Sequence, residues 1–267
     1  LFEDAGLGVR ISSDRALLAT IGDEYQAIFV RSQDIPEFVA DGAADAGITG
    51  WDLVRESERD LVDRLDLGFG RCRIVVAARE DSGIGTVEEI PAGSRVATVF
   101  PRLTGRFFER ISRPVALVPV SGATEIAPHL GIADVIVDIV STGSTLKVNG
   151  LREVATVLDS SARLILKADA SAEITRAIDR LAIRLESVVR ARGQRYVMAN
   201  VPREALERIK DVVPGINGPT VVDIMNGGRH VAVHAVVAAK AIDQTIADLK
   251  SLGAEGILVT RIERLMP

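Results

Sequence analysis

Cysteine is almost absent from this sequence of 267 residues, in which Cys72 stands alone. A single thiol allows neither an intrachain disulfide nor a cysteine-bound zinc or iron-sulfur cluster, so we expect a reducing compartment. The sequence also lacks any run of about 18 or more apolar residues, which a membrane span needs, and a basic-then-apolar signal segment at its start. These absences predict a cytoplasmic protein that binds no membrane.

An excess of charge of one sign is missing as well. The 32 Lys+Arg residues are offset by 37 Asp+Glu, and both signs are scattered along the chain. This balance argues against a general nucleic-acid binder, so any anionic ligand must be held locally. The length suggests about two domains, with ample apolar residues for their cores. The chain begins at Leu1, and residues 1–7 resemble the tail of an amphipathic helix, so we expect further residues upstream of this numbering.

Short apolar segments alternate with segments of helical periodicity, which is typical of an α/β protein with mostly parallel strands. For the first lobe the pattern predicts strands at 25–30, 46–49, 61–67 and 73–78, with helices at 35–40 and 51–57. Behind a charged stretch at 79–85, a second lobe repeats the plan with strands at 95–98, 115–120 and 135–140, and helices at 103–110 and 123–130. Strands at 151–158 and 163–166 then lead into a long helix at 171–192.

A different rhythm begins after Gly193. The pattern predicts strands at 195–200, 220–225, 230–237 and 256–262, helices at 203–213 and 241–252, and a tight turn at Asn226-Gly227-Gly228. This order, βαββαβ, is that of the ferredoxin-like unit. We therefore predict three parts: lobe I at 1–79 with 163–192, lobe II at 80–162, and a C-terminal domain at 193–267.

The most informative segment is the end of the apolar strand at 135–140. It runs into Ser141, Thr142, Gly143, Ser144 and Thr145, which carry four hydroxyls and a glycine before a short helical stretch. Ligands of open α/β sheets bind beyond the carboxyl ends of strands, where free N–H groups can hold a phosphate. The segment has neither the lysine of a P-loop nor a GxGxxG fingerprint. The alternative is a plain polar turn.

Asp138 lies inside this apolar strand, where a carboxylate is costly to bury without partners. From there it could accept hydrogen bonds from the vicinal hydroxyls of a sugar. Asp134 points to the same strand face but lies about 13 Å back, at about 3.3 Å per residue. We therefore expect Asp138 to contact the sugar and leave Asp134 as a cap or a polar tie.

These residues resemble a known family. Asp134-Val-Ile-Val-Asp138 with Ser141-Thr-Gly-Ser-Thr145, followed by Asn149-Gly-Leu-Arg-Glu153, is similar to the signature of ATP phosphoribosyltransferase, the first enzyme of histidine biosynthesis. Further segments resemble the family in order across nearly the whole chain: Arg31-Ser-Gln-Asp34-Ile-Pro36, Gly47-Ile-Thr-Gly50-Trp-Asp52-Leu, Leu65-Asp-Leu-Gly-Phe-Gly70, Ser121-Gly-Ala-Thr-Glu125-Ile-Ala-Pro128 and Leu252-Gly-Ala-Glu-Gly256-Ile-Leu258. The C-terminal unit matches the long form of the enzyme.

The resemblance implies two catalytic lobes arranged like a type II periplasmic binding protein. It implies that N1 of the adenine of ATP attacks the anomeric carbon of phosphoribosyl pyrophosphate, which releases pyrophosphate with inversion. Residues 141–145 would bind the 5-phosphate, Asp138 the ribose hydroxyls, and Mg²⁺ the leaving group; no catalytic base and no dedicated metal ligands are identified. Arg31, Gly50 and Glu125 would contact ATP. For Arg31 a surface ion pair, and for Glu125 a helix-dipole contact, are the alternatives.

The resemblance further implies inhibition by histidine, near Asn200 and Thr220 in the C-terminal domain, and dimers that associate into hexamers. Two departures matter: Asn200 stands where a carboxylate would meet the ammonium of histidine, and the family's opening strand with its basic glycine loop has no counterpart here.

Other conspicuous residues favour plain roles: Cys72 as a passive thiol, His129 as a helix-end partner, Trp51 as a packing residue, and His230 with His234 as a structural or effector-contacting pair. Two rival functions stay open. One is a two-lobed small-molecule-binding module without catalysis, and the other is a phosphoribosyltransferase that salvages free bases.

Overall fold

The computed structural model describes residues 1–13, 17–225 and 228–266. Contacts divide the chain into two compact units, residues 29–182 and residues 1–28 with 183–267. Within the described residues, no helix is both long enough and apolar enough to pass through a bilayer.

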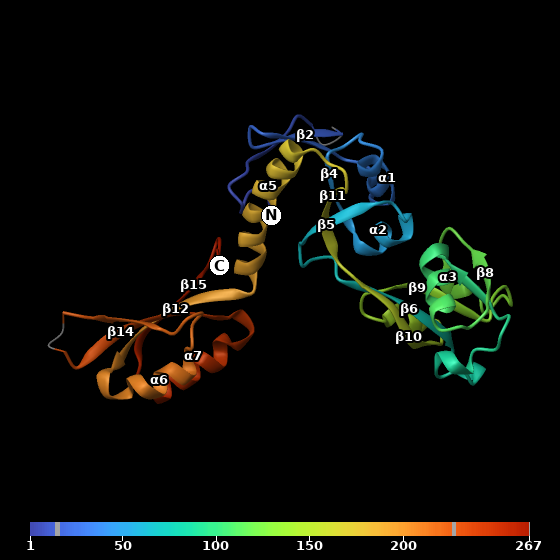
Figure 1. The fold of residues 1–267 in the computed structure, drawn as a ribbon. Coiled ribbons are helices and arrows are strands. Elements are labelled where there is room, and N and C mark those ends of the chain that lie inside the picture. Colours follow the sequence, from blue (N-terminus) through green and yellow to red (C-terminus); the bar gives the residue numbers. More distant parts are fainter. Residues whose placement is uncertain (14–16, 226–227, 267) are drawn as a thin grey trace. The chain divides into compact units, whose positions relative to one another are not determined.

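The unit of residues 29–182 contains two sheets (Figure 1). The first has the order β4-β11-β5, with β4 (Ala46–Gly50) and β5 (Leu61–Asp66) both antiparallel to the central β11 (Ala162–Lys167). Helices α1 (Ile35–Ala40) and α2 (Trp51–Ser57) accompany it, preceded by the 3-10 turn η1 (Ser32–Asp34). Val39, Val54 and Ile165 form its small core. We call this part the first subdomain.

The second sheet has the order β10-β6-β9-β7-β8. Its strands are β6 (Cys72–Arg79), β7 (Arg95–Thr98), β8 (Ala116–Pro119), β9 (Val135–Val140) and β10 (Leu151–Ser160). Helix α3 (Pro101–Arg110) connects β7 to β8, and α4 (Ser144–Val148) follows β9. The loops of this part contain three 3-10 turns, η2 (Glu80–Ser82), η3 (Val87–Glu89) and η4 (Thr124–Ile126). We call this part the second subdomain.

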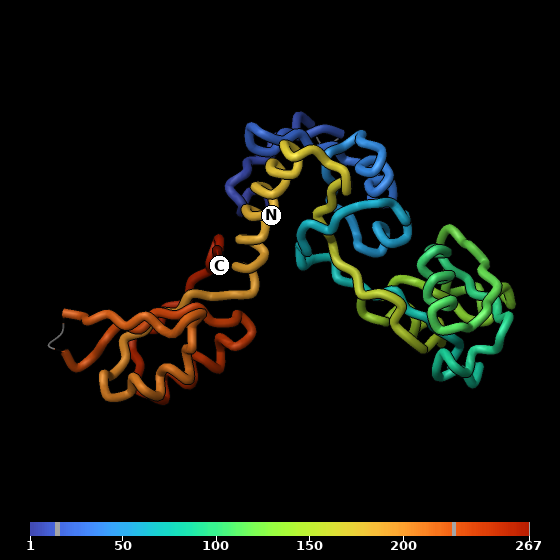
Figure 2. The backbone as a smooth tube through the Cα atoms, in the orientation of Figure 1, coloured from blue at the N-terminus to red at the C-terminus, as the bar shows by residue number. Residues whose placement is uncertain are grey.

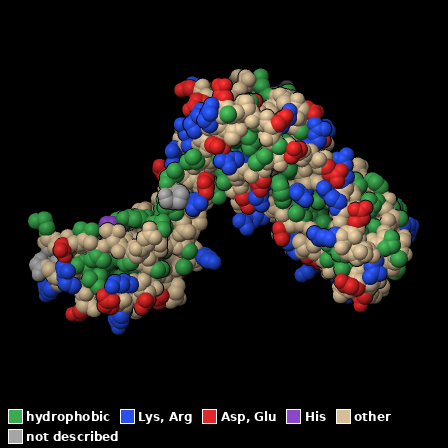
Figure 3. Space-filling view, in the orientation of Figure 1, with side chains coloured by type: hydrophobic (Ala, Val, Ile, Leu, Met, Phe, Trp, Pro, Cys, Tyr) green, Lys and Arg blue, Asp and Glu red, His purple; other side chains and the backbone are tan. Residues whose placement is uncertain are grey.

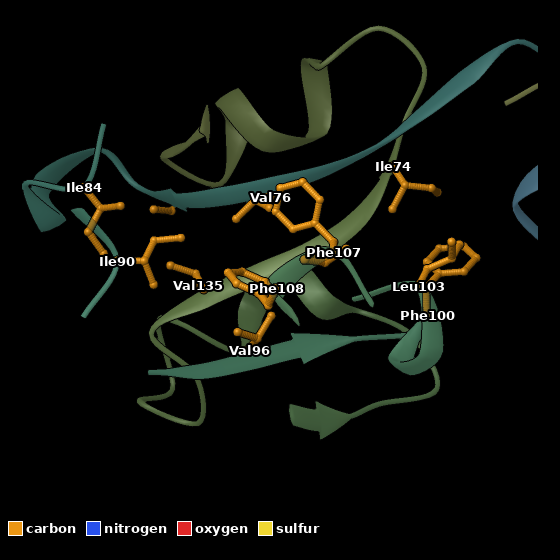
Figure 4. Packing of buried hydrophobic residues seen from close by; sticks show 12 residues of the cluster. Ile74, Val76, Ile84, Ile90, Val96, Phe100, Leu103, Phe107, Phe108 and Val135 are labelled. Carbon is orange, nitrogen blue, oxygen red and sulfur yellow. The ribbon is translucent and has the colours of Figure 1, made fainter. Parts of the chain in front are cut away.

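A single apolar cluster holds α3 against this sheet. Phe107 and Phe108 of α3 meet edge to face and pack on Ile74, Val76 and Val135 of the strands (Figure 4). Pro101 at the first helical position suits the start of α3, since it lacks an N–H group that the helix would leave unpaired. Because β7 and β9 pair in parallel, their carboxyl ends lie at the same edge of the sheet.

The expectation of mostly parallel strands is wrong. Among the described strands only β7/β8 and β7/β9 pair in parallel. The chain passes from the first subdomain into β6 and returns along β10 into β11, so β6 and β10 run in opposite directions and pair antiparallel (Figure 2). Strand β6 also enters the sheet antiparallel to β9, which a helix-strand alternation cannot indicate.

The helix expected at residues 123–130 is also wrong. Only one 3-10 turn forms, η4, because Ala123 has a left-handed φ of 49° and Gly131 a φ of 66°. Pro128 additionally lacks the N–H that a continuing helix would use. The other helices predicted in this unit are confirmed, α1 and α2 at the predicted bounds.

In the other unit, β1 (Val9–Ile11), β2 (Leu18–Ile21) and β3 (Tyr25–Ile28) form an antiparallel meander. The sequence pattern does not predict β1 and β2, and residues 1–7 form hydrogen-bonded turns rather than the end of a helix. Helix α5 (Ala172–Arg192) spans both units.

The C-terminal sheet has the order β13-β14-β12-β15, and the predicted βαββαβ succession is confirmed. Its strands are β12 (Gln194–Pro202), β13 (Thr220–Asp223), β14 (His230–Ala238) and β15 (Glu255–Arg261); its helices are α6 (Leu206–Val212) and α7 (Ile242–Ser251), each after a 3-10 turn, η5 (Arg203–Ala205) and η6 (Ala239–Ala241). Alternate residues of β14, from Val231 to Val237, pack in the core. The predicted turn at 226–228 lies largely outside the described residues.

Candidate functional site

The hydroxyl-rich loop lies at the carboxyl end of β9, the inner strand of the second sheet. Ser141, Thr142, Ser144 and Thr145 are exposed, and Leu146 anchors α4 in the core. The Thr142 and Ser144 hydroxyls hydrogen-bond to each other at 3.0 Å. No side chain among the described residues caps α4 at Gly143. The hydroxyls of the loop are therefore exposed, and the first turn of α4 has no side-chain cap among the described residues.

Gly143 gives the loop its shape. Its φ of 78° lies in the left-handed region, which side chains other than glycine adopt at a cost. A Cβ atom built there would lie 4.0 Å from the nearest atom, Cγ1 of Val140, so space alone does not require glycine. The conformation of the turn does.

Asp138 is half-buried on β9, just before this loop. Burial raises the pKa of its carboxyl above the ordinary value, although the Ile139 N–H, which donates to Oδ1 at 2.7 Å, and the Thr124 hydroxyl lower it. Glu125 raises the pKa further by its charge. Asp138 and Glu125, assigned from the sequence to different substrates, therefore lie on two elements in contact, β9 and η4, near enough for one charge to affect the other.

Thr124, next to Glu125 on η4, is fully buried, and its hydroxyl reaches no partner in hydrogen-bond geometry among the described residues. Its influence on the pKa of Asp138 nevertheless places it beside that carboxyl. The pair of acids thus adjoins a buried hydroxyl.

Asp134 takes the other role expected for it, that of a polar tie. Its carboxylate accepts hydrogen bonds from Nη2 of Arg95 at 2.9 Å and from the Arg95 N–H at 2.8 Å. The Arg95 side chain holds the pKa of Asp134 below its ordinary value. Asp134 therefore joins the starts of β9 and β7.

The candidates of the first subdomain come from neighbouring segments. Gly50 ends β4 and precedes α2; a Cβ atom there would lie 2.4 Å from Oδ1 of Asp52, so a larger residue would have to displace this buried carboxylate from its hydrogen bond with Ser160. Thr49 donates its hydroxyl to the carbonyl of Ser32 at 2.8 Å, which joins this turn to the segment that begins with Arg31. The Arg31 side chain is exposed and forms no ion pair with a described residue.

Sequence reasoning missed a polar cavity of about 370 Å³ where the two subdomains meet. Three arginines, three serines, two aspartates and the single cysteine line it: Arg71, Arg73, Arg163, Ser141, Ser160, Ser161, Asp66, Asp159 and Cys72. The guanidinium and hydroxyl groups can bind anionic oxygens. Arg71 and Arg73 on either side of Cys72, and the adjacent Ser160 and Ser161 between two strands, are the signals that could have indicated it.

The charges in this cavity are held by specific contacts. Arg163 pairs with Asp63 at 2.8 Å and with Asp66 at 3.3 Å, while its Nε is buried without a partner among the described residues. Burial raises the pKa of Asp66, but hydrogen bonds from Ser161 and the Gly68 N–H bring it below its ordinary value. Asp66 therefore stays ionised beside Arg163.

Cys72 is a poor nucleophile in this setting. Burial and the nearby Asp52 carboxylate raise the pKa of the thiol, and a hydrogen bond involving Ser160 only partly offsets them. Because the thiolate is the reactive form, this agrees with the passive role expected for Cys72.

The remaining residues singled out from the sequence lie in packing or tethering contacts. The guanidiniums of Arg55 and Arg163 each lie 5.6 Å from the centre of the Trp51 ring. Nε2 of His129 contacts the carbonyl of Asn149 at 2.7 Å, at the end of α4.

In the C-terminal sheet, Asn200 lies opposite Ala232 and Thr220 opposite His234. Asn200 and Thr220 therefore share the sheet face that points away from the buried valines of β14. The Tyr196 hydroxyl contacts Nδ1 of His234 at 3.0 Å on that face. Within the described residues, no group of three or more His, Cys, Asp or Glu side chains is arranged to bind a metal.

The geometry defines an α/β chain whose second sheet presents an acid and a hydroxyl loop at one edge, a class of site suited to sugar phosphates. Comparison with known proteins gives the family. A model described as "ATP phosphoribosyltransferase" matches residues 31–187, and one described as "HisG, C-terminal domain" matches residues 191–264.

Relatives match along the whole chain. An ATP phosphoribosyltransferase of Gemmatimonas aurantiaca is 64% identical over 100% of this chain and 94% of its own, and one of Natronomonas pharaonis is 50% identical with the same coverage. Among solved structures, a chain of the ATP phosphoribosyl transferase (HisG:HisZ) complex from Thermotoga maritima matches 71% of this chain and 90% of its own, with 26% identity and a TM-score of 0.61.

The chain belongs to the ATP phosphoribosyltransferase family, in the long form that carries the C-terminal domain. It is a pentosyltransferase of histidine biosynthesis, and the predicted fold class is confirmed. The full-length matches favour this over both rival functions, the binding module without catalysis and the salvage enzyme for free bases.

Proposed function

We propose that the loop 141–145 and Asp138 bind phosphoribosyl pyrophosphate, and that Arg31, Gly50 and Glu125 contribute to the ATP site. The observation that carries the proposal is the half-buried Asp138, close to Glu125 and directly before hydroxyls and N–H groups that hold few partners within the chain. The loop donates to the 5-phosphate, while Asp138 accepts from the ribose hydroxyls.

The reaction proceeds through a transition state with positive charge on the ribose and negative charge on the departing pyrophosphate. Catalysis of this kind depends on positioning and on electrostatic complementarity rather than on a covalent step by the protein. Asp138 and Glu125 place negative charge beside the ribose. The exposed guanidinium of Arg31 is available to phosphate oxygens of the substrates. The chain's part is therefore to orient two anionic substrates toward each other.

Two nearby carboxylates also fit the requirements of Mg²⁺, which usually takes one or two carboxylates together with substrate phosphates and water. Asp138 and Glu125 would face the ion, and the bound ion would neutralise charge on the pyrophosphate. Burial is the main reason that the pKa of Asp138 is raised, and the charge of Glu125 adds to it; a bound cation would favour the ionised form of both carboxylates.

The arginine-lined cavity beside Ser141 extends the site toward the first subdomain. Its guanidiniums and hydroxyls suit the anionic part of a substrate that approaches from that side. The two subdomains would then act as the catalytic lobes; the boundary expected after residue 79 lies earlier, because β6 (Cys72–Arg79) belongs to the second sheet.

We further propose that residues 193–267 form the regulatory domain, in which Asn200 and Thr220 lie near a histidine pocket, and that the chain assembles into dimers and hexamers. Asn200 and Thr220 share one face of the C-terminal sheet, which supports a common pocket.

Hydrophobic side chains are visible on the surface of this domain in Figure 3, and the edge strands β13 and β15 expose Val221, Val222, Leu258 and Val259, which supports assembly. The use of ATP and phosphoribosyl pyrophosphate supports a cytoplasmic location.

Two measurements test this proposal. The intact chain mixed with ATP, phosphoribosyl pyrophosphate and Mg²⁺ should form the adduct, followed by its absorbance. Hydrogen exchange should then slow in peptides that cover residues 139–148 when phosphoribosyl pyrophosphate and Mg²⁺ are added, and stay unchanged in peptides from β12. Turnover without protection of residues 139–148 would place the sugar phosphate elsewhere.

A further inference from the structure

Helices α2 and α3 lie side by side, although one belongs to the first subdomain and the other to the second (Figure 1). Helix α2 contributes to both cores: Val54 and Trp51 pack in the first subdomain, while Leu53 packs against the apolar cluster of the second. The N-terminal end of α2 follows Gly50, a candidate ATP contact. The placement of α2 therefore bears on the site.

The first turn of α3 lacks a cap of its own. Phe100 occupies the N-cap position and has no side chain that could accept a hydrogen bond. Glu56 of α2 takes this role from the other subdomain. Its Oε1 accepts from the Arg102 N–H at 3.0 Å, and its Oε2 accepts from the Leu103 N–H at 2.9 Å.

The contact is reciprocal. The Arg102 side chain donates to the carbonyls of Glu56 at 3.2 Å and Ser57 at 3.0 Å, and Arg106 donates to the carbonyl of Arg55. Each helix thus supplies partners for backbone groups that the other leaves unpaired at its end. Because one carboxylate binds two N–H groups at once, the geometry of the contact is closely defined.

We propose that Glu56 is a positioning residue: its cross-helix cap fixes α2, and with it the turn at Gly50, relative to the second sheet. This rests on the proposed division of the substrates between the two subdomains. Removal of Glu56 should lower the catalytic rate without weakening the binding of phosphoribosyl pyrophosphate, because the loop 141–145 and Asp138 lie wholly in the second subdomain.

Glu56→Ala in the full chain should reduce kcat by about tenfold to a hundredfold, the range expected for a small misplacement of reacting groups. Calorimetry with phosphoribosyl pyrophosphate and Mg²⁺ in the absence of ATP should give a Kd within twofold of the unmodified chain. Hydrogen exchange in peptides covering residues 100–106 should become about tenfold faster. Glu56→Gln, which keeps one acceptor oxygen, should restore part of the rate.

Arg113→Ala is the matched control, because Arg113 lies past the opposite end of α3 and donates to the carbonyls of Ile90 and Glu88. It should lower the Tm without a change of kcat above twofold. A loss of kcat in Glu56→Ala no larger than in Arg113→Ala, or unchanged exchange at residues 100–106, would overturn the proposal. Should Glu56→Ala not fold, the same comparison of kcat and exchange in Glu56→Gln decides. If all variants and the unmodified chain bind phosphoribosyl pyrophosphate without protection of residues 139–148, the proposed site fails instead.

Discussion

Two helix starts lie at the same edge of the second sheet, after the parallel strands β7 and β9. At α3 two backbone N–H groups donate to the Glu56 carboxylate. At α4, by contrast, no side chain among the described residues caps the helix, and the hydroxyls of the loop 141–145 face solvent. Two helix starts at equivalent places in the sheet therefore differ. The start of α3 is capped by a side chain of the protein, and the start of α4 has no side-chain cap among the described residues. Under the proposed function, an uncapped first turn, rather than the strand-to-helix order alone, distinguishes the binding loop.

Asp138→Ala should have the largest effect on the proposed site before α4. Removal of the carboxylate takes away the acceptor for the ribose hydroxyls and negative charge beside the developing cation, so kcat/KM for phosphoribosyl pyrophosphate should fall by about 10²–10³-fold. Steady-state kinetics measures the loss, and circular dichroism checks that the fold is kept. Asp134→Ala, at the other end of β9, is the control and should lose activity far less.

The pH dependence follows from the same carboxyl. Because burial raises the pKa of Asp138, kcat/KM for phosphoribosyl pyrophosphate should decline by about tenfold per pH unit below that raised pKa as the carboxylate takes up a proton. A profile measured on the unmodified chain should therefore break at a higher pH than an ordinary aspartate would give. No break in that region would contradict the assignment.

The raised pKa also predicts an effect on folding. The protonated form favours the folded state at low pH, and this contribution is lost as the pH rises through the folded-state pKa. At neutral pH the ionised carboxylate therefore opposes folding, and Asp138→Asn should raise the Tm while activity falls.

Thr142→Val removes one donor from the open loop and keeps its size. A hydrogen bond to a charged group contributes about 1.5–3 kcal/mol, so the Kd for phosphoribosyl pyrophosphate should rise by at least about tenfold. Calorimetry measures the Kd, and Thr260→Val on β15, an exposed hydroxyl in the C-terminal sheet, should leave it unchanged. Equal Kd values for the two variants would exclude Thr142 from the phosphate site.

Two glycines, Gly143 before α4 and Gly105 inside α3, should respond to alanine in opposite directions. Gly143→Ala places a Cβ at a φ of 78°, with a cost of about 1–2 kcal/mol, so the Tm should fall by a few degrees. Gly105 lies inside α3, and a Cβ there would be 3.7 Å from Cδ1 of Leu117, an ordinary contact. Gly105→Ala should therefore raise the Tm, since alanine favours a helix by about 0.5–1 kcal/mol over glycine. Thermal unfolding of both variants checks the opposite signs.

The site candidates at the uncapped loop before α4 can be predicted from the amino-acid sequence, whereas the cap on α3 cannot. The run of hydroxyls after an apolar strand, and the acid within that strand, are local patterns, so the sequence alone is enough to select Asp138 and Ser141 as site candidates. The cap on α3 joins Glu56 to residues 46 and 47 positions away, which no periodicity indicates. The same holds for the cavity, whose Arg73 and Arg163 come together only when β6 and β11 are placed.

The errors in the fold have a similar origin. Helices α1 and α2 follow clear apolar spacing, and their predicted bounds are confirmed. Residues 123–130 show helical spacing too, but the left-handed Ala123 and Pro128 limit them to one turn. Strands β1 and β2 are only three and four residues long, which is short for a period of two to stand out. Burial does alternate in β2, but its exposed Leu18 is apolar, so the amino-acid sequence does not show this alternation.

The smallest effect is expected from Glu58→Ala, beside the start of α3 that Glu56 caps. Glu58 forms ion pairs with Arg102 at 3.6 Å and Arg106 at 3.3 Å, but the carboxylate is 45% exposed, and water and salt weaken such pairs. It also accepts no backbone N–H of α3 among the described contacts. The variant should change kcat by less than twofold, measured beside Glu56→Ala under the same conditions. A large loss would mean that net negative charge near α3, rather than the two hydrogen bonds of Glu56, holds the helices together, and raising the salt concentration would then reproduce the loss in the unmodified chain.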